Sequence, residues 1–292
     1  MNLSPPQHLG GTMTDLQVDG ENGWTRFWNH GRLWKAALAV VVYLALYQLL
    51  GYAAIPLIRP FIDTENFFAT PASVFFGLGA PVAIGAIILI VFVLSLGWFK
   101  PLFAPQPVKG RWWMWFFVVL VVVPIVLRFA GIDYAGYGID VVTTALFVGL
   151  FIGFVEEILY RGIVVKILRS AGHREWTVAV VSSLIFALSH SINLISGMPV
   201  LTVALTVLFT FGFGMMMYLV MRVTGNIIWA MLIHAMTDPT TFLGSGGIDA
   251  SSGAAHSPLI DIAGPFSLIF VGAALIAMIF IRGKASTVDV AH

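Results

Sequence analysis

Long apolar stretches dominate the sequence, and most of them have the roughly 20-residue length at which a helix crosses the hydrocarbon core of a bilayer. Eight such stretches follow one another along the chain, at 35–58, 73–98, 112–127, 141–168, 176–194, 199–221, 226–237 and 259–281. Within lipid, a helix bonds its own backbone polar groups. We therefore predict an all-α, polytopic membrane protein with about eight transmembrane helices.

Composition supports this fold class and excludes several others. Only 10% of the 292 residues are charged, against roughly 25% in an ordinary soluble domain. The formal net charge of +1 argues against a basic nucleic-acid-binding domain, so we expect the bilayer and no nucleic acid as a partner. The chain contains no cysteine, which excludes a disulfide framework, a thiol nucleophile and thiolate metal ligands.

The basic residues predict the orientation of the helices, because cytoplasmic loops collect Lys and Arg. With the N-terminus inside, 13 of the 15 basic residues fall on inner segments or inner helix ends. Arg59 and Arg128 are the two exceptions. We therefore expect both termini on the cytoplasmic side of an integral membrane protein, and a bacterial plasma membrane as its location.

Ionisable side chains inside the spans are the main chemical signal, since each is costly there and is a functional candidate by default. Glu156, His190 and His234 belong to three different spans and lie 12 to 14 residues from the inner ends of their helices. At the helical rise this spacing places them at a similar depth, about 18 to 21 Å from those ends. We predict that the three side chains neighbour each other near the middle of the bilayer.

The two adjacent glutamates have different surroundings in the fourth span. Glu157 and Arg161 are four residues apart on one helical face, which predicts an ion pair between them. Glu156 lies about 100° away around the helix and has no charged partner within that helix. An unpaired carboxylate at this depth is suited to general acid–base chemistry.

The two histidines each have a neighbour one helical turn away. Phe186 precedes His190 by four residues, so ring and imidazole share a face. Asp238 follows His234 by four residues, where its carboxylate could hold one ring nitrogen. The alternative is that Asp238 simply ends the helix before Pro239.

These residues leave two chemistries open, after others are excluded. There is no His-Glu-x-x-His motif, and Asp133 and Asp140 fall in a predicted outer loop. Glu156 with His190 could activate a water for attack on a peptide carbonyl, with His234 and Asp238 on the oxyanion side. Alternatively, the same residues could bind a zinc-like cation with an open water position.

Three motifs, taken in order, resemble the CPBP family, the CAAX-processing and bacteriocin-processing membrane proteases that are also called the Abi family. They are Glu156-Glu157-x-x-x-Arg161, Phe186-x-x-x-His190 and His234-x-x-x-Asp238, each within its own apolar helix. The resemblance covers about 141–238. It implies a membrane endopeptidase whose glutamate activates water, acting on a peptide or a membrane-protein segment.

By the same resemblance, Glu156 would be the water-activating base and His190 its partner. His234 with Asp238 would lie on the oxyanion side, and Glu157, Arg161 and Phe186 would support them. Many members have Asn where this chain has Asp238. Members are often labelled metallopeptidases; we prefer a mechanism without a cofactor, and zinc held by Glu156, His190 and His234 is the alternative.

The resemblance also divides the chain into four predicted parts. These are a flexible polar tail (1–32), three helices (33–140), a catalytic core of four helices (141–240), and an outer loop with a last helix and short tail (241–292). Two other functions remain open. A non-catalytic immunity or scaffold protein would retain the fold, and a proton-coupled transporter would also use a buried Glu and two His.

Overall fold

The computed structural model describes residues 22–245 and 257–286, and these are almost entirely helical. Within these ranges, seven helices are long and apolar enough to cross a membrane, by length and composition. They are Leu33–Phe61 (α2 and η1), Pro71–Ser95 (α3, η2 and α4), Trp112–Gly131 (η3 and α6), Ile139–Ser170 (α8, η4 and α9), Glu175–Leu194 (α10 and η5), Val200–Thr224 (α11) and Pro258–Phe280 (α13 and α14). Four further helices are α1 (Gly23–Asn29), α5 (Phe99–Phe103), α7 (Tyr134–Tyr137) and α12 (Ile227–Ser245).

The predicted fold class is confirmed, and seven of the eight predicted spans coincide with these apolar helices. The remaining predicted span, 226–237, lies in α12, which is not among the seven. Its predicted end is wrong, because α12 continues through Pro239 to Ser245. Beyond the proline, the hydroxyl groups of Thr240 and Thr241 donate to the carbonyl groups of Met236 and Thr237, both at 2.7 Å. These bonds satisfy the two hydroxyl groups within the helix itself.

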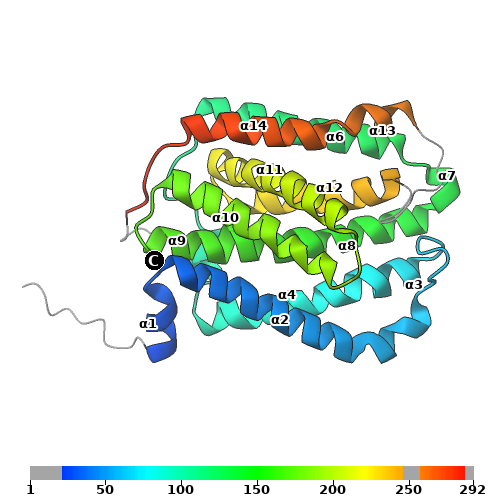
Figure 1. Cartoon of the computed structure of the whole chain (residues 1–292), viewed down its shortest axis with the longest axis horizontal. Coiled ribbons are helices and arrows are strands. Elements are labelled where there is room, and N and C mark those ends of the chain that lie inside the picture. Colours follow the sequence, from blue (N-terminus) through cyan, green and yellow to red (C-terminus); the bar gives the residue numbers. More distant parts are fainter. Residues whose placement is uncertain (1–21, 246–256, 287–292) are drawn as a thin grey trace, which may run out of the picture.

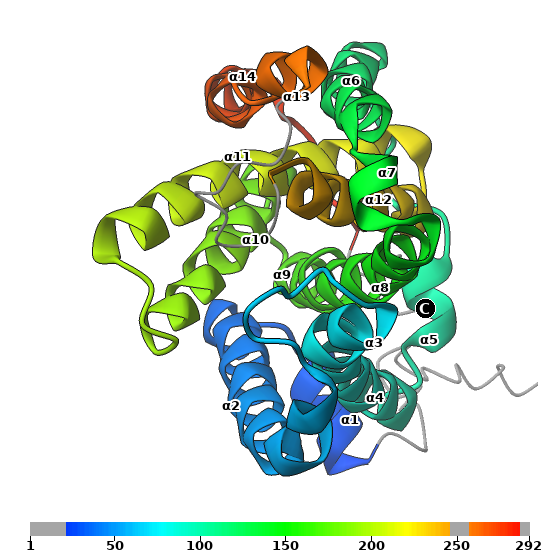
Figure 2. The same ribbon diagram turned by 90° about the vertical axis from the view of Figure 1, so that its right-hand side faces the viewer.

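The helices form layers around α8 (Ile139–Glu157) and its continuation η4 (Ile158–Val164) and α9 (Val165–Ser170). α2 and α4 (Ala80–Ser95) cover one side of this central helix, and α10 (Glu175–Ser189), α11 and α12 cover the other (Figures 1 and 2). α6 (Trp115–Gly131), α13 (Pro258–Ala263) and α14 (Phe266–Phe280) lie beyond α11 and α12. α12 packs against α8, α11 and α6, and Ile228, Trp229 and Leu232 remain exposed on its other face.

Two glycines bring α8 and α12 into close backbone contact. A Cβ atom on Gly149 would lie 2.2 Å from the carbonyl oxygen of Ala235, and one on Gly153 would lie 2.3 Å from that of Met231. The glycines are four residues apart, the small-residue spacing by which membrane helices approach each other closely. This contact fixes the position of α12 against the end of α8.

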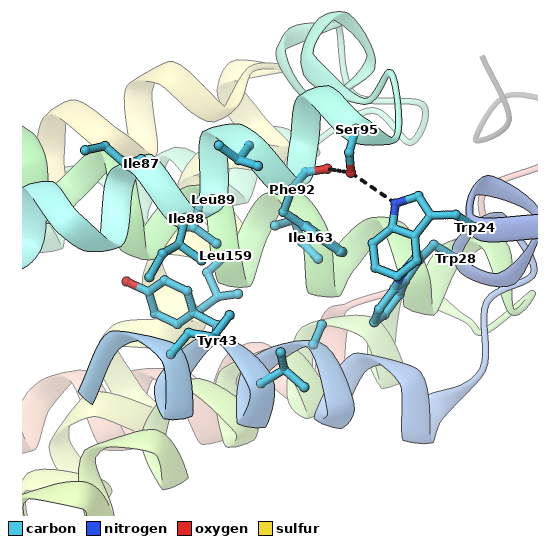
Figure 3. A pocket seen from close by; sticks show the side chains of 14 residues that line it. Trp24, Trp28, Tyr43, Ile87, Ile88, Leu89, Phe92, Ser95, Leu159 and Ile163 are labelled. Atoms are coloured by element: carbon cyan, nitrogen blue, oxygen red, sulfur yellow. Dashed lines mark hydrogen bonds between the residues drawn. The ribbon is translucent and has the colours of Figure 1, made fainter. Parts of the chain in front are cut away.

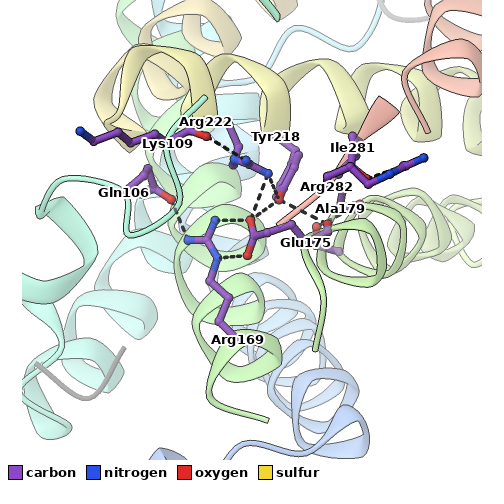
Figure 4. A network of polar contacts seen from close by, with 10 residues as sticks. Gln106, Lys109, Arg169, Glu175, Ala179, Tyr218, Arg222, Ile281 and Arg282 are labelled. Carbon is purple, nitrogen blue, oxygen red and sulfur yellow. Dashed lines mark hydrogen bonds and ion pairs between the residues drawn. The ribbon is translucent and has the colours of Figure 1, made fainter. Parts of the chain in front are cut away.

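A buried polar network joins α9, α10 and α11 at one end of the bundle (Figure 4). Arg169 donates to both carboxylate oxygens of Glu175, at 2.9 and 2.8 Å. Arg222 lies 3.4 Å from the same carboxylate and donates to the carbonyl of Lys109 at 3.0 Å, and the Tyr218 hydroxyl also donates to Glu175. The sequence places these arginines at the inner helix ends, and the structure shows that they hold those ends together.

Both ends of the described chain lie beside this network. The amide of Glu175 donates to the carbonyl of Gly283 at 3.0 Å, and Gly31 lies against the backbone of Ile167. The two ends therefore share one side of the bundle; that this side faces the cytoplasm stays a prediction. The predicted flexible tail lies outside the described residues as far as residue 21, and its end contains α1. Of the outer loop predicted at the start of 241–292, residues 241–245 belong to α12 and residues 246–256 lie outside the described residues.

Candidate active site

The candidate site begins where α8 passes into the π-helical turn η4. Glu156 and Glu157 are the last residues of α8, and Arg161 lies within η4. π-Helical turns inside longer helices are often found at functional sites. The predicted ion pair is present, with Arg161 Nη1 at 3.0 Å from Glu157 Oε1, and both side chains are fully buried.

Arg161 is held in place by two further groups. Its Nη2 donates to the carbonyl of Gly214 in α11 at 2.8 Å, and its guanidinium lies 4.7 Å from the centre of the Phe186 ring. A Cβ on Gly214 would approach the guanidinium to 3.2 Å, so the glycine leaves room for this contact. The arginine therefore links α8, α10 and α11 around the Glu157 carboxylate.

His234 of α12 is oriented by Glu157. Its Nδ1 donates a hydrogen bond to Glu157 Oε1 at 2.7 Å, and its side chain is 2% exposed. A carboxylate on one ring nitrogen fixes the ring and directs the other nitrogen. Sequence analysis missed this contact, because Glu157 and His234 are 77 residues apart and nothing in either motif relates the two helices.

The other nitrogen of His234 faces two partly exposed carboxylates. Nε2 lies 3.5 Å from Glu156 Oε2 and 3.7 Å from Asp238 Oδ2. The side chains of Glu156 and Asp238 are 28% and 27% exposed, whereas that of Glu157 is fully buried. Glu157 is enclosed and bonds Arg161, as the sequence predicts. Glu156, which the sequence leaves without a charged partner in its own helix, is partly exposed and lies near His234 of α12.

His190 reaches the same cluster through an aromatic ring. Its Nδ1 donates to the carbonyl of Phe186 at 3.0 Å, which leaves Nε2 as the acceptor of the neutral ring. The Phe186 ring meets His190 edge-to-face at 5.0 Å and His234 at 6.1 Å between ring centres. The Tyr160 hydroxyl bonds Ser189 at 2.7 Å, which fixes the same turn of α10 from the η4 side.

The structure thus brings the predicted residues into one cluster and changes two of the predicted pairings. Glu156 is paired with His234, and no hydrogen bond or ion pair joins Glu156 to His190 directly. Glu157, not Asp238, makes the short bond to His234. Phe213 is an additional neighbour that the sequence did not indicate, and its ring centre lies 4.9 Å from that of His234.

The zinc alternative is not matched by the arrangement of these side chains. Among the described residues, no group of three His, Asp or Glu side chains is placed so that it could hold a metal ion. In each ring Nδ1 is bonded, to Glu157 in His234 and to a backbone carbonyl in His190, so only Nε2 of either ring would be open to a ligand. We therefore derive no catalytic step through a metal.

Chemically, the cluster combines an accessible carboxylate with two oriented imidazole rings. A carboxylate can accept a proton from water, and a protonated ring nitrogen can donate to a developing oxyanion. Glu156 and the Nε2 atoms of both histidines are the atoms available for such steps, since Glu157 and Arg161 already bond one another.

Comparison with known proteins agrees with the motifs. No curated protein and no solved structure matches the chain. Residues 138–240 match the family model described as type II CAAX prenyl endopeptidase Rce1-like. This range contains the whole cluster, from Glu156 to Asp238. Residues 138–240 are therefore similar to the type II CAAX prenyl endopeptidases of the Rce1-like family, in agreement with the resemblance of the three motifs.

Proposed function

We propose that the protein is an intramembrane endopeptidase that hydrolyses a peptide bond in a peptide or in a membrane-associated protein segment. The Rce1-like segment supports a CAAX-type membrane protease at the level of the family. The observation that carries the proposal is the cluster itself: an accessible Glu156 lies 3.5 Å from an imidazole whose opposite nitrogen is held by a buried glutamate.

In the proposed mechanism, Glu156 removes a proton from a water molecule as the water oxygen attacks the carbonyl carbon of the scissile bond. The other O–H of this water donates a hydrogen bond to Nε2 of His190, which orients the water. A protonated Nε2 of His234 donates to the oxyanion. When the tetrahedral intermediate collapses, Glu156 returns the proton to the leaving amine, so the carboxylate is regenerated.

Asp238 balances the charge of His234 in this scheme. Its carboxylate lies 3.7 Å from Nε2, beyond hydrogen-bond distance, and its side chain is 27% exposed. Because an ionised Asp offers no proton, it cannot donate to the oxyanion as the Asn of many CPBP members can. Asp238 thus stabilises the protonated ring that makes the donation.

An apolar cavity beside the site suits a substrate that is itself embedded in the membrane. Its volume is about 450 Å³, within the range of small-molecule pockets. Leu159 and Ile163 of η4 line it together with Tyr43 of α2 and Leu89 of α4 (Figure 3). Since Leu159 is three residues after Glu156, an apolar part of the substrate bound there would lie close to the catalytic cluster.

The proposal is tested with the full chain purified and reconstituted in vesicles, using a panel of internally quenched peptides. We expect the wild-type protein to cleave some of them and His190→Ala to lower kcat by about 10²- to 10⁴-fold, the usual contribution of a group that handles protons. His173→Ala, in the loop between α9 and α10, is the matched control and should cleave at the wild-type rate.

Two results would contradict the proposal. Absence of cleavage by well-folded wild-type protein over a broad panel would favour the non-catalytic scaffold. Equal rates for His190→Ala and wild type would remove His190 from the reaction.

A further inference from the structure

Arg128 is a charged residue that the proposed mechanism does not use. It is one of the two basic residues that depart from the inner ends of the helices, and it lies within α6. The residue is only 8% exposed, whereas Arg59, the other exception, lies exposed at the outer end of α2. An arginine inside a membrane helix is costly unless a partner or a function compensates for it.

Within residues 22–245 and 257–286, no partner for this guanidinium is present. Arg128 takes part in no ion pair within 4.0 Å, and its Nη1 is buried without a hydrogen bond. Removing an unbonded donor from water costs roughly 1 to 3 kcal/mol and more when it is charged. The other buried arginines with roles in the fold, Arg161, Arg169 and Arg222, each bond a carboxylate or a carbonyl.

Arg128 lies on the outer flank of the candidate site. α6 packs against α12, and a Cβ on Gly244 of α12 would lie 3.8 Å from Arg128 Cγ. The charge of Arg128 interacts with that of Asp238, the nearest member of the cluster along α12. No ion pair joins Asp238 to Arg128 among the described residues, and Asp238 has His234 at 3.7 Å, so Asp238 does not satisfy the guanidinium.

We propose that Arg128 binds a carboxylate of the peptide substrate and so determines specificity for a substrate with a negative charge near the scissile bond. The planar guanidinium offers parallel donors that match a carboxylate. Arg161 and the ring of His234 both bond Glu157, whereas Arg128 has no bonded carboxylate among the described residues. This inference rests on the proposed endopeptidase activity.

A structural role for Arg128, as a counter-ion for Asp238, predicts different behaviour. Removing a structural counter-ion would lower the stability of the protein and would lower the cleavage rate of every substrate to the same extent. Removing a substrate-binding cation would lower the cleavage rate only of substrates that contain the carboxylate. It would leave stability unchanged or increase it, because an unpaired buried charge is then replaced.

The test compares Arg128→Met and Arg128→Gln with wild type on pairs of internally quenched peptides. Each pair has one sequence, synthesised with a free C-terminal carboxylate or with a C-terminal amide. Arg128→Met keeps an unbranched, apolar stem at a buried position, so we expect it to fold. Arg59→Gln removes the exposed outer arginine and is the matched control.

We expect wild type and Arg59→Gln to prefer the carboxylate peptide, and both Arg128 variants to lose roughly tenfold to hundredfold in kcat/KM on that peptide alone, mainly through KM. Their thermal midpoints should equal or exceed that of wild type. A third peptide, amidated at its end and carrying a Glu side chain near the cleaved bond, shows whether the carboxylate comes from the chain end or from a side chain.

The inference is overturned if both Arg128 variants cleave the acid, amide and Glu-containing peptides more slowly by the same factor, or if they cleave all three at the wild-type rate. It is also overturned if the thermal midpoints of both variants fall sharply. These outcomes differ from failure of the proposed function, in which wild type itself cleaves no peptide.

Discussion

At the residue scale, two neighbouring glutamates show how environment assigns different tasks to the same side chain. Glu157 is fully buried and bonds Arg161 and His234, whereas the Glu156 side chain is 28% exposed and lies 3.5 Å from His234. Helical geometry alone predicts the Glu157–Arg161 pair. It cannot predict the bond to His234, because that bond depends on the position of α12 relative to α8.

This difference predicts that the same substitution has a large effect on stability at Glu157 and a small one at Glu156. Glu157→Gln should lower the free energy of unfolding by about 3 to 5 kcal/mol, because it leaves the buried charge of Arg161 uncompensated. Glu156→Gln should change it by less than about 1 kcal/mol, since the side chain is partly exposed and makes only the longer contact to His234. Denaturant unfolding of the two purified variants measures both values.

The two variants are matched in chemistry and adjacent in sequence. Equal losses of stability would show that both carboxylates serve the fold and would contradict the separation of their roles.

At the element scale, the approach of α12 to α8 sets the geometry of the site. Gly149 and Gly153 allow the backbones to meet, and His234 of α12 can then reach Glu157 at the end of α8. The glycine spacing is visible in the sequence, but the partner helix is not. Pro239 likewise indicates a helix end in the sequence, whereas α12 continues through it to Ser245.

A methyl group on Gly153 should therefore disturb the site at a distance. Gly153→Ala places Cβ 2.3 Å from the carbonyl oxygen of Met231, so α12 must move. We expect a loss of about 1 to 3 kcal/mol in stability, as for other overpacked positions, and a fall in kcat because His234 shifts from Glu157. Thermal unfolding and the peptide assay together measure the two effects.

Gly272→Ala is the matched control for this prediction. Gly272 lies in α14, and a Cβ there would meet nothing within 4 Å. Because alanine favours a helix over glycine by up to about 1 kcal/mol, this variant should be as stable as wild type or more stable. A Gly153→Ala protein that matched Gly272→Ala in stability and rate would contradict the proposed role of the α8–α12 contact.

At the scale of the whole molecule, most of the architecture is predictable because a bilayer permits few solutions. The apolar stretches predict the seven apolar helices to within a few residues, with α12 as the exception. The scarcity of charge leaves Glu156, His190 and His234 visible as a group. The network around Glu175 was not predicted, because Arg169 and Arg222 are indistinguishable in the sequence from other basic residues at the predicted inner ends of helices. Side-chain pairings between helices depend on helix rotation, which the sequence does not specify.

The central claim is that Glu156 activates the attacking water without a metal. The most direct measurement is the single-turnover rate of peptide cleavage by Glu156→Gln in vesicles, with a metal chelator present throughout. Glu65→Gln, in the exposed loop before α3, is the control. The account predicts that wild type and Glu65→Gln cleave at the same rate with or without chelator, and that Glu156→Gln is slower by about 10²- to 10⁴-fold. A wild-type rate in Glu156→Gln, or a chelator-induced loss in wild type that zinc restores, would contradict it.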